Sequence, residues 1–309
     1  MSDFAFLAAS TFMKVPPPVA AARPFGLAGV AWDGSTTNRP GARFGPRAIR
    51  EASHMLCDGI HPLFDTTPAD ALDDRGDLLL PNTGLGPMRE AFARALPALL
   101  ARQHMVWLGG DHSITLPILR ALREQEGRPL AVIHFDAHCD TWTSHFGEPS
   151  GHGTWVYEAF QEGLVVPECF TQIGIRSAGE RAARDYVQEQ GGVIHTARAL
   201  RGREGPAQLA EVTGGIRERL AAHGRPPLYL SLDIDCLDPA FAPGTGTPEP
   251  GGMTTNQVLT LLEELADLDF VGMDCVEVAP PYDHADLTAY AAATFVWAYL
   301  CGRLARGVR

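Results

Sequence analysis

The sequence contains no pair of cysteines with C-x-x-C spacing, although it has six cysteines in 309 residues. This absence argues against a thiolate zinc site and a disulfide framework, and it favours a reducing cytoplasm. No apolar run reaches the length of about 18 residues that a membrane span needs. The N-terminus carries no basic stretch ahead of a sustained apolar segment. We therefore expect a cytoplasmic protein with no membrane partner.

Positive charge is also scarce, because 25 Lys and Arg stand against 37 Asp and Glu and give a formal net charge of −12. This balance disfavours a nucleic-acid partner and suits a cationic small molecule. A chain of this length with 45% hydrophobic residues can bury a large core. No repeat, low-complexity tract or long linker divides it. We expect one domain over residues 1–309, with 1–22 as an N-terminal extension.

Short apolar runs rich in β-forming residues alternate with helical patterns along the chain. The runs lie at 25–32, 104–110, 130–136, 170–175, 228–233 and 270–274. The helical patterns lie at 45–57, 87–102, 115–125, 179–190, 206–223, 254–267 and 286–304. Thr254 and Gln257 have capping-box spacing, whereas Pro97 predicts a kink or break in its helix. The alternation predicts an α/β fold of three layers, with a central, mostly parallel sheet flanked by helices.

Three of the apolar runs end in acidic residues and histidines, namely "GGDHS" (109–113), "FDAHCD" (135–140) and "SLDIDCLDP" (231–239). The carboxyl ends of parallel strands meet at one edge of a sheet, so these segments can share one site. Side chains alternate along an extended chain. Asp136 and His138 should therefore point the same way, as should Asp233 and Asp235, with Asp140 following as the strand ends.

Gathered carboxylates repel one another unless a positive charge lies among them, and a metal ion is the simplest one. The candidate ligands are His112, Asp136, His138, Asp140, Asp233 and Asp235. They are too many for one tetrahedral zinc ion and suit two octahedral divalent ions, manganese more than zinc. Two ions about 3.5–4 Å apart lower the pKa of a shared water from about 15.7 towards 7. The set therefore predicts a binuclear hydrolase.

Each motif also has a purely structural interpretation. An Asp-x-Asp pair at a strand end is often a solvated turn. "GGDHS" can be a strand-to-helix turn in which Asp111 or Ser113 caps the next helix. His152 in its glycine-flanked loop can be a surface residue, and Glu277 can be a loop acid or a helix cap. The presence of all three acidic segments in one chain favours the metal site.

These segments resemble the three signature segments of the ureohydrolase family, which includes arginase, agmatinase, guanidinobutyrase and proclavaminate amidinohydrolase. In addition, "RPGARFGPRAIRE" (39–51) resembles the family's N-terminal motif, and "GMDCVEVAPPYD" (272–283) resembles its late strand-end segment. The likeness runs from about residue 11 to residue 305. It implies an arginase/deacetylase-type α/β fold, two Mn(II) ions per chain and a homo-oligomer, commonly a trimer or hexamer.

The resemblance also implies a role for each residue that matches a family motif. One ion would be held by His112, Asp136, Asp140 and Asp233, and the other by Asp136, His138, Asp233 and Asp235. His152, in "SGHGT", matches the histidine that shuttles a proton to the leaving amine. Glu277 matches the carboxylate that pairs with the guanidinium. A bridging hydroxide would attack the guanidinium carbon, Asp235 and the metals would stabilise the tetrahedral intermediate, and urea and an amine would leave.

The choice of guanidino substrate depends on weaker features. The stretch 141–151 does not match the polar loop with which arginase holds the amino-acid end of L-arginine, so arginase activity is disfavoured. "TFMKVP" (11–16) resembles the "TFMR"-type start of the agmatinase, guanidinobutyrase and proclavaminate amidinohydrolase branch, with Lys14 in place of Arg.

Charge near the expected mouth of the pocket favours agmatine, which would give putrescine and urea. Loops 141–151 and 277–290 contain Glu148, Asp283 and Asp286 but no Lys or Arg. Against this, an arginine of 176–184 can turn inward and bind a carboxylate tail, which favours 4-guanidinobutyrate or another guanidino acid.

Two further alternatives come from other functional classes. A single-zinc deacetylase shares the fold type but needs one metal, and the intact His112 and Asp140 argue against it. A non-catalytic partner subunit usually lacks metal ligands, whereas no ligand is missing here. A binuclear guanidino hydrolase remains the favoured prediction.

Overall fold

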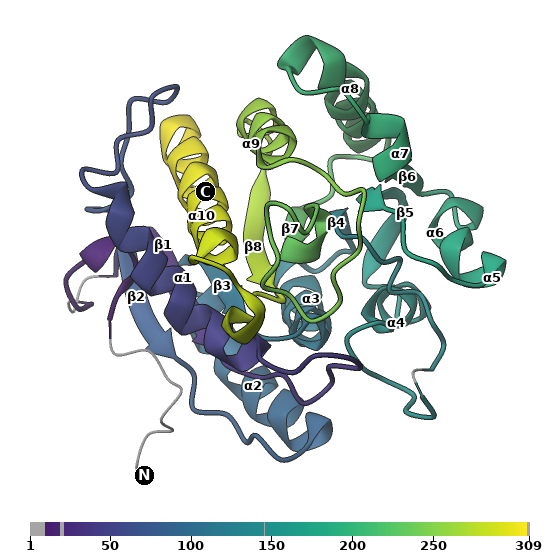
Figure 1. Cartoon of the computed structure of the whole chain (residues 1–309), viewed down its shortest axis with the longest axis horizontal. Helices are drawn as coiled ribbons and strands as arrows, with labels where there is room; N and C mark the ends of the chain where they lie inside the picture. The colour runs from purple at the N-terminus through teal and green to yellow at the C-terminus, as the bar shows by residue number, and fades with distance from the viewer. Residues whose placement is uncertain (1–9, 19–21, 145, 308–309) are drawn as a thin grey trace.

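The computed structural model describes residues 10–18, 22–144 and 146–307 (Figure 1). Within these residues, eight strands form one sheet in the order β2-β1-β3-β8-β7-β4-β5-β6, and every neighbouring pair is parallel. The strands are β1 (Phe25–Val30), β2 (Leu72–Asp77), β3 (His104–Gly109), β4 (Leu130–Phe135), β5 (Val165–Ile175), β6 (Val193–Thr196), β7 (Leu228–Asp233) and β8 (Phe270–Val276). The predicted α/β fold with a central parallel sheet is confirmed.

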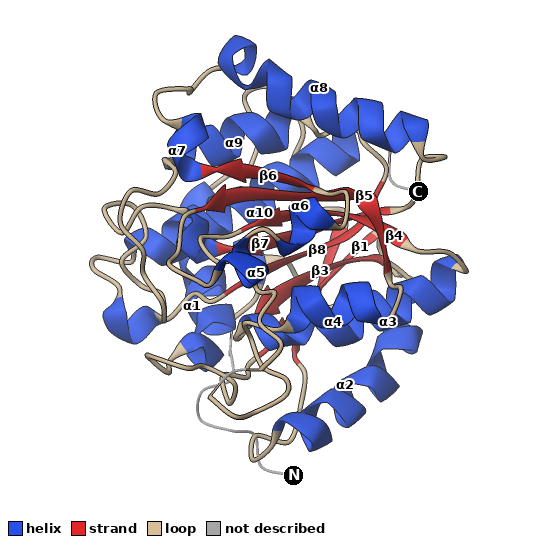
Figure 2. Ribbon diagram, turned by 90° about the vertical axis from the view of Figure 1, so that its right-hand side faces the viewer, coloured by secondary structure: helices blue, strands red, loops and turns tan. Residues whose placement is uncertain are grey.

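Helices cover both faces of the sheet and complete the three layers (Figure 2). One layer holds α1 (Gly45–Ser53), α8 (Pro206–Ala222), α9 (Thr255–Glu264) and α10 (Leu287–Arg306), and the other holds α2 (Leu85–Leu100), α3 (Thr115–Glu126) and α4 (Trp155–Gln161). Each layer buries its own apolar core against the sheet, with Leu261 and Phe295 in the first core and Phe92 and Trp155 in the second.

Short helical segments complete the chain. They are α5 (Arg181–Arg184), α6 (Tyr186–Glu189), α7 (Ala197–Leu200) and the 3-10 turns η1 (Phe12–Lys14), η2 (Ala42–Phe44), η3 (His54–Leu56), η4 (His112–Ile114), η5 (Ile234–Cys236) and η6 (Pro280–Tyr282). None of the helices in the described part of the chain combines the length and apolarity needed to cross a membrane.

Two local predictions about helices have opposite outcomes. The capping box at α9 is confirmed, because Gln257 N–H donates to Thr254 Oγ1 (3.1 Å) and Thr254 N–H donates to Gln257 Oε1 (3.0 Å). Of the kink or break predicted at Pro97, the break does not occur, because α2 continues through Pro97 to Leu100. Pro97 lies in the last turn of the helix, where a missing N–H removes a single backbone hydrogen bond.

The N-terminal segment packs on α1 and β2 where it is described. Phe12 is fully buried, and its backbone N–H donates to Asp74 Oδ2 at 2.7 Å. Met13 N–H donates to Ser53 Oγ at 2.7 Å. Residues 1–9 and 19–21 of the expected extension lie outside the described residues, so its boundary at residue 22 stays a prediction.

The strand order places the acidic segments side by side. β3, β8, β7 and β4 are consecutive neighbours in the sheet and all point the same way. "GGDHS" follows β3, "DAHCD" follows β4, "DID" closes β7, and Glu277 follows β8 directly. Segments from four distant parts of the sequence therefore meet at one edge of the sheet, where α/β proteins bind ligands.

Candidate active site

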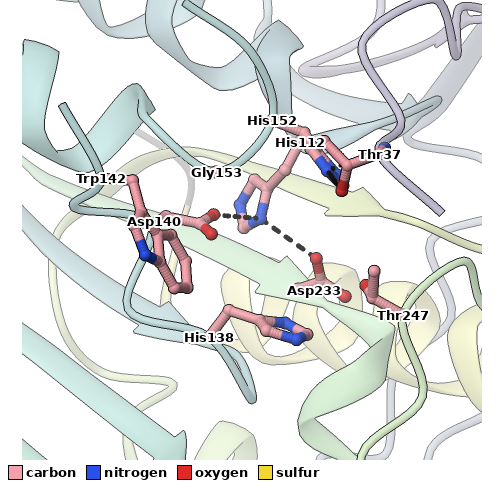
Figure 3. A pocket seen from close by; sticks show the side chains of 9 residues that line it. All are labelled: Thr37, His112, His138, Asp140, Trp142, His152, Gly153, Asp233 and Thr247. Atoms are coloured by element: carbon pink, nitrogen blue, oxygen red, sulfur yellow. Dashed lines mark hydrogen bonds and ion pairs between the residues drawn. The ribbon is translucent and has the colours of Figure 1, made fainter. Parts of the chain in front are cut away.

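His112 lies among three carboxylates, two of which, Asp140 and Asp233, are drawn with it in Figure 3. Its Nδ1 atom is 3.1 Å from Asp136 Oδ2, 3.2 Å from Asp140 Oδ2 and 3.1 Å from Asp233 Oδ2. All four side chains are buried. One imidazole nitrogen thus faces three acidic oxygens, two from the segment that follows β4 and one from the end of β7.

His138 joins a second cluster that shares Asp136 with the first. Its Nδ1 atom is 3.2 Å from Asp136 Oδ1 and 3.0 Å from Asp235 Oδ2. Asp235 Oδ1 also accepts a hydrogen bond from Ala137 N–H at 3.0 Å, which ties the loop after β4 to the end of β7. The structure therefore brings together all six ligands predicted from the sequence.

The chain does not stay extended between Asp233 and Asp235, as strand alternation would require. It enters η5 at Ile234, because Asp233 Oδ1 accepts a hydrogen bond from Asp235 N–H at 2.8 Å and caps the turn. Both carboxylates still face the site. Asp111 likewise caps η4 through Ser113 N–H at 3.1 Å, so the predicted cap and the site histidine next to it occur together.

The electrostatics of the two clusters call for a cation. Burial raises the pKa of Asp233 well above its usual range, and the charges of Asp235 and Asp136 raise it further. Burial lowers the pKa of His112, but its carboxylate neighbours outweigh burial and raise that pKa well above its usual value. No Lys or Arg of the described chain forms an ion pair with these carboxylates.

The donor set fits divalent metal ions. His112 Nδ1 is buried and makes no hydrogen bond of acceptable geometry within the described residues, although three carboxylate oxygens surround it. Such a nitrogen, aimed with carboxylate oxygens at one point, matches the ligands of a single cation. Two groups of His and Asp ligand atoms are close enough to hold an ion, and both contain Asp136.

Three supporting residues were not predicted from the sequence. His134 Nε2 lies 2.8 Å from Asp136 Oδ2, and Gln172 Nε2 lies 3.1 Å from His134 Nδ1. Trp155 Nε1–H donates to Asp140 Oδ2 at 2.7 Å. The signal for His134 was its position two residues before Asp136 on the same strand face. Trp155 carried no such signal, since it lies 15 residues beyond its partner.

Glu277 and His152 form a pair beside the first cluster. Glu277 Oε1 accepts a hydrogen bond from His112 N–H and lies within hydrogen-bond distance of His152 Nδ1, both at 2.9 Å. Glu277 Oε2 is buried and has no partner among the described residues. The backbone of Glu277 has φ of +64°, a left-handed conformation that costs energy for a residue with a side chain. The free oxygen of this strained, buried carboxylate can therefore accept a hydrogen bond from a ligand.

The environment of His152 favours its charged form. Burial lowers the pKa of His152, but the hydrogen bond and negative charge of Glu277 outweigh burial and raise it to about 9. At neutral pH the imidazole therefore carries a proton that it can give away.

A cavity of about 100 Å³ opens onto these groups. It is lined by Thr37, His112, His138, Asp140, Trp142, His152, Gly153, Asp233 and Thr247 (Figure 3). Thr37, Trp142 and Thr247 were not predicted, because threonine and tryptophan in loops carry no distinctive pattern. The described lining contains no Lys or Arg.

Some of the charged residues that were considered for the pocket mouth or for binding the substrate tail have other roles. Arg176 donates to backbone carbonyls, including Asp235 O at 2.8 Å and Glu249 O, and it does not line the cavity. Asp283 accepts from Thr288 N–H at 3.0 Å and from Ala289 N–H, which occupies its carboxylate at the start of α10. Glu148 lines a neighbouring outer cavity.

Two curated relatives share about two fifths of their aligned residues with this chain. An agmatinase of Chromobacterium violaceum is 42% identical over 281 residues, which cover 89% of this chain and 82% of the relative. A guanidinopropionase of Pseudomonas aeruginosa is 42% identical over 303 residues, which cover 96% and 92%.

Solved structures share the fold along almost the whole chain. Proclavaminate amidino hydrolase from Streptomyces clavuligerus superposes with a TM-score of 0.86 at 38% identity, covering 98% of this chain and 99% of that one. A hypothetical agmatinase from Burkholderia thailandensis gives 0.84 at 37% identity, covering 94% and 90%. The model of the arginase family matches residues 23–302. The chain therefore belongs to the arginase family.

Proposed function

We propose that this protein is a manganese-dependent hydrolase that cleaves agmatine to putrescine and urea. Family membership and the guanidino-compound hydrolases among the relatives support the reaction class. The observation that carries the substrate is the cavity lining, which contains two aspartates and three histidines but no Lys or Arg in the described chain. A substrate with a second positive charge suits such a cavity, whereas a carboxylate tail would lack a counter-ion.

The metal ligands follow from the two clusters. His112, Asp136, Asp140 and Asp233 would hold one Mn(II) ion, and Asp136, His138, Asp233 and Asp235 the other. Oxygen-rich ligands with two imidazoles and no thiolate favour manganese over zinc. When bound, the two metal ions would supply a hydroxide nucleophile at neutral pH, because they lower the pKa of a shared water.

The protein's own residues bind and orient the substrate. Glu277 Oε2, buried and without a partner in the described chain, accepts a hydrogen bond from the planar guanidinium. This contact places the guanidinium carbon beside the two carboxylate clusters, because Glu277 Oε1 is fixed on His112 N–H. Asp235 would also help to stabilise the tetrahedral intermediate. His152, with its pKa raised to about 9, supplies the proton that the leaving amine takes up.

A guanidino acid is the second candidate, because one of the two relatives is a guanidinopropionase that covers nearly the whole chain. We also propose that the protein works in the cytoplasm as a homo-oligomer. The six free thiols, five of them buried, support a reducing compartment.

The test is urea release by the manganese-loaded protein from agmatine, 4-guanidinobutyrate, 3-guanidinopropionate and L-arginine, compared by kcat/KM. We expect agmatine to be the preferred substrate. Preference for a carboxylate-tailed compound would overturn agmatine as the substrate, but the proposed reaction class would stand. Absence of urea from all four compounds would overturn the proposed function.

A further inference from the structure

Thr37 lies in the loop between β1 and α1, beside His152 in the wall of the catalytic cavity (Figure 3). Its hydroxyl oxygen is 2.8 Å from His152 Nε2, and its backbone N–H donates to the same nitrogen at 3.2 Å. The other ring nitrogen, Nδ1, is 2.9 Å from Glu277 Oε1. Both nitrogens of the imidazole thus have partners in the protein.

These partners restrict how His152 can exchange protons. The histidine is 7% exposed and Glu277 is 1% exposed, so the Nδ1 side of the ring is closed to solvent. A histidine that gives up a proton in each turnover must be reprotonated before the next one. The Nε2 side, where Thr37 is only half-buried, is the side through which this can happen.

Beyond Thr37 lies a second, outer cavity of about 520 Å³. Polar side chains of Ser35, Thr36, Glu148 and Ser150 line it together with Thr37. The hydroxyls of Ser35 and Thr36 have no hydrogen-bond partner in the described part of the chain. A polar space of this size admits water. Thr37 belongs to the described lining of both cavities.

The loop that carries Thr37 is fixed at both sides of it. Ser35 N–H donates to Asp111 Oδ2 at 2.8 Å, and Asn38 Nδ2 donates to Gly246 O at 2.9 Å. The position of the Thr37 hydroxyl against the imidazole is therefore set by the fold and not by a freely moving loop.

We propose that Thr37 is a positioning residue for His152, whose hydroxyl holds the imidazole Nε2 and connects that nitrogen to solvent in the outer cavity. A hydronium ion or buffer acid there gives a proton to Thr37 Oγ1 as this oxygen passes its own proton to Nε2. The acid's bond to hydrogen and the original O–H bond of Thr37 break, while a new O–H bond on Thr37 and an N–H bond at Nε2 form. The imidazolium then supplies the proton for the leaving amine. This inference rests on the proposed function.

Substitutions at Thr37 separate the hydroxyl from the shape of the side chain. In manganese-loaded protein with agmatine, T37V should lower kcat at least ~10-fold and leave KM nearly unchanged, because proton transfer by a positioned group contributes ~10²–10⁴. T37S keeps the hydroxyl and should retain most of the activity. T37A leaves room for a water molecule and should fall between the two.

Added imidazole gives a second readout that a structural defect would not produce. A small diffusible acid–base can replace the lost hydroxyl, so imidazole should raise kcat of T37V several-fold and leave the wild type unchanged. The pH profile of T37V should depend on buffer concentration. The charged groups that face His152 are Glu277, Asp111 and Asp140, and all of them are kept in these variants. T213V, at a helix threonine far from the site, is the matched control and should behave as wild type.

Wild-type kcat in T37V, or T37S as slow as T37V, would overturn the proposal while the proposed function stands. If the wild type releases no urea from any guanidino compound, the proposed function fails. The contact between Thr37 and His152 is then tested by NMR, which needs no turnover. In zinc-loaded protein with 15N-labelled histidine, signals lost in H152N identify His152. T37V should shift the Nε2 signal and T37S should not, whereas an unchanged T37V signal would contradict the contact.

Discussion

Asp74, on β2, and Asp233, at the end of β7, are equally buried carboxylates, each 3% exposed, with opposite surroundings. Asp74 receives two hydrogen bonds from the Arg50 guanidinium, at 2.8 and 2.9 Å, and the same guanidinium pairs with Asp77. Asp233 faces Asp136, Asp235 and the imidazole of His112. The first carboxylate is paired with an arginine, whereas the second has only an imidazole that it shares with further carboxylates.

The difference separates a structural network from a functional one. A buried carboxylate paired with a buried arginine is satisfied within the fold. Carboxylates gathered without Lys or Arg leave the folded chain with repulsion that a bound cation relieves. The fold tolerates this repulsion at the carboxyl ends of β3, β4 and β7, where ligands bind, and not at the edge strand β2.

The largest expected effect comes from D233N compared with D74N. D233N removes a ligand shared by the two proposed ions and should lower kcat/KM at least ~10³-fold. Its metal-free form should unfold at the same or a higher temperature than the metal-free wild type. The reason is that Asp233 has a raised pKa, so its ionised form lowers stability as pH rises above the ordinary value of 3.8.

D74N should give the reverse result, with lower thermal stability whether or not metal is present, because Arg50 then lacks its main partner. Urea assays and thermal unfolding of both variants, with and without Mn²⁺, check the contrast. Equal losses of thermal stability in metal-free D233N and D74N would contradict the distinction between the Asp233 and Asp74 networks.

The next largest effect comes from R50M compared with R47M on the same helix. Arg50 is fully buried, and its removal leaves Asp74 and Asp77 without a counter-ion, which costs about 3–5 kcal/mol of the free energy of unfolding. Arg47 pairs with Glu51 at the surface, where solvent screens the two charges, so its loss should change the free energy of unfolding very little. Denaturant unfolding measures both. A similar loss in the two variants would contradict the structural role of the buried pair.

Removal of metal should have a moderate effect on the wild type. A ligand at 100 times its Kd stabilises the folded state by about 2.7 kcal/mol per site. Chelation should therefore lower the unfolding temperature of the wild type by several degrees and leave D233N nearly unchanged. If neither EDTA nor added Mn²⁺ changes the unfolding temperature of the wild type, the result would count against the metal centre.

The smallest expected effect is a pH dependence of stability from His152. Its pKa is raised from 6.5 to about 9 in the folded chain, so its stabilising contribution is fully present below pH 6.5 and is lost as pH rises through about 9. H152N lacks this contribution. In metal-free protein the difference in unfolding temperature between wild type and H152N should shrink between pH 6.5 and 9, and a constant difference would refute the raised pKa.

Much of the fold could be predicted from the sequence, because the buried strands are continuous apolar runs that only a covered parallel sheet accommodates. β2 was missed because "LDDRGD" has four charged residues, and these are stabilised by long-range partners such as Arg50 and Gln103. β6 was missed because it has four residues at the edge of the sheet. Tertiary contacts, which the local pattern does not contain, decide both strands.

The candidate ligands could be predicted because three segments with carboxylates, two of them also with histidines, follow apolar runs of one chain, although each segment alone also has a structural interpretation. The contacts around them could not. Thr37 lies 115 residues from His152, and Arg176, one of the arginines that could have bound a carboxylate tail, binds backbone carbonyls. Such contacts depend on the exact path of loops, which pattern and spacing do not determine.

The central claim is that the unneutralised carboxylates hold two divalent ions. Elemental analysis of protein dialysed against Mn²⁺ and then freed of excess metal tests it most directly. The account predicts two manganese ions per chain in the wild type and in D74N, and fewer than two in D233N. One ion or none in the wild type, or the same content in D233N, would contradict it.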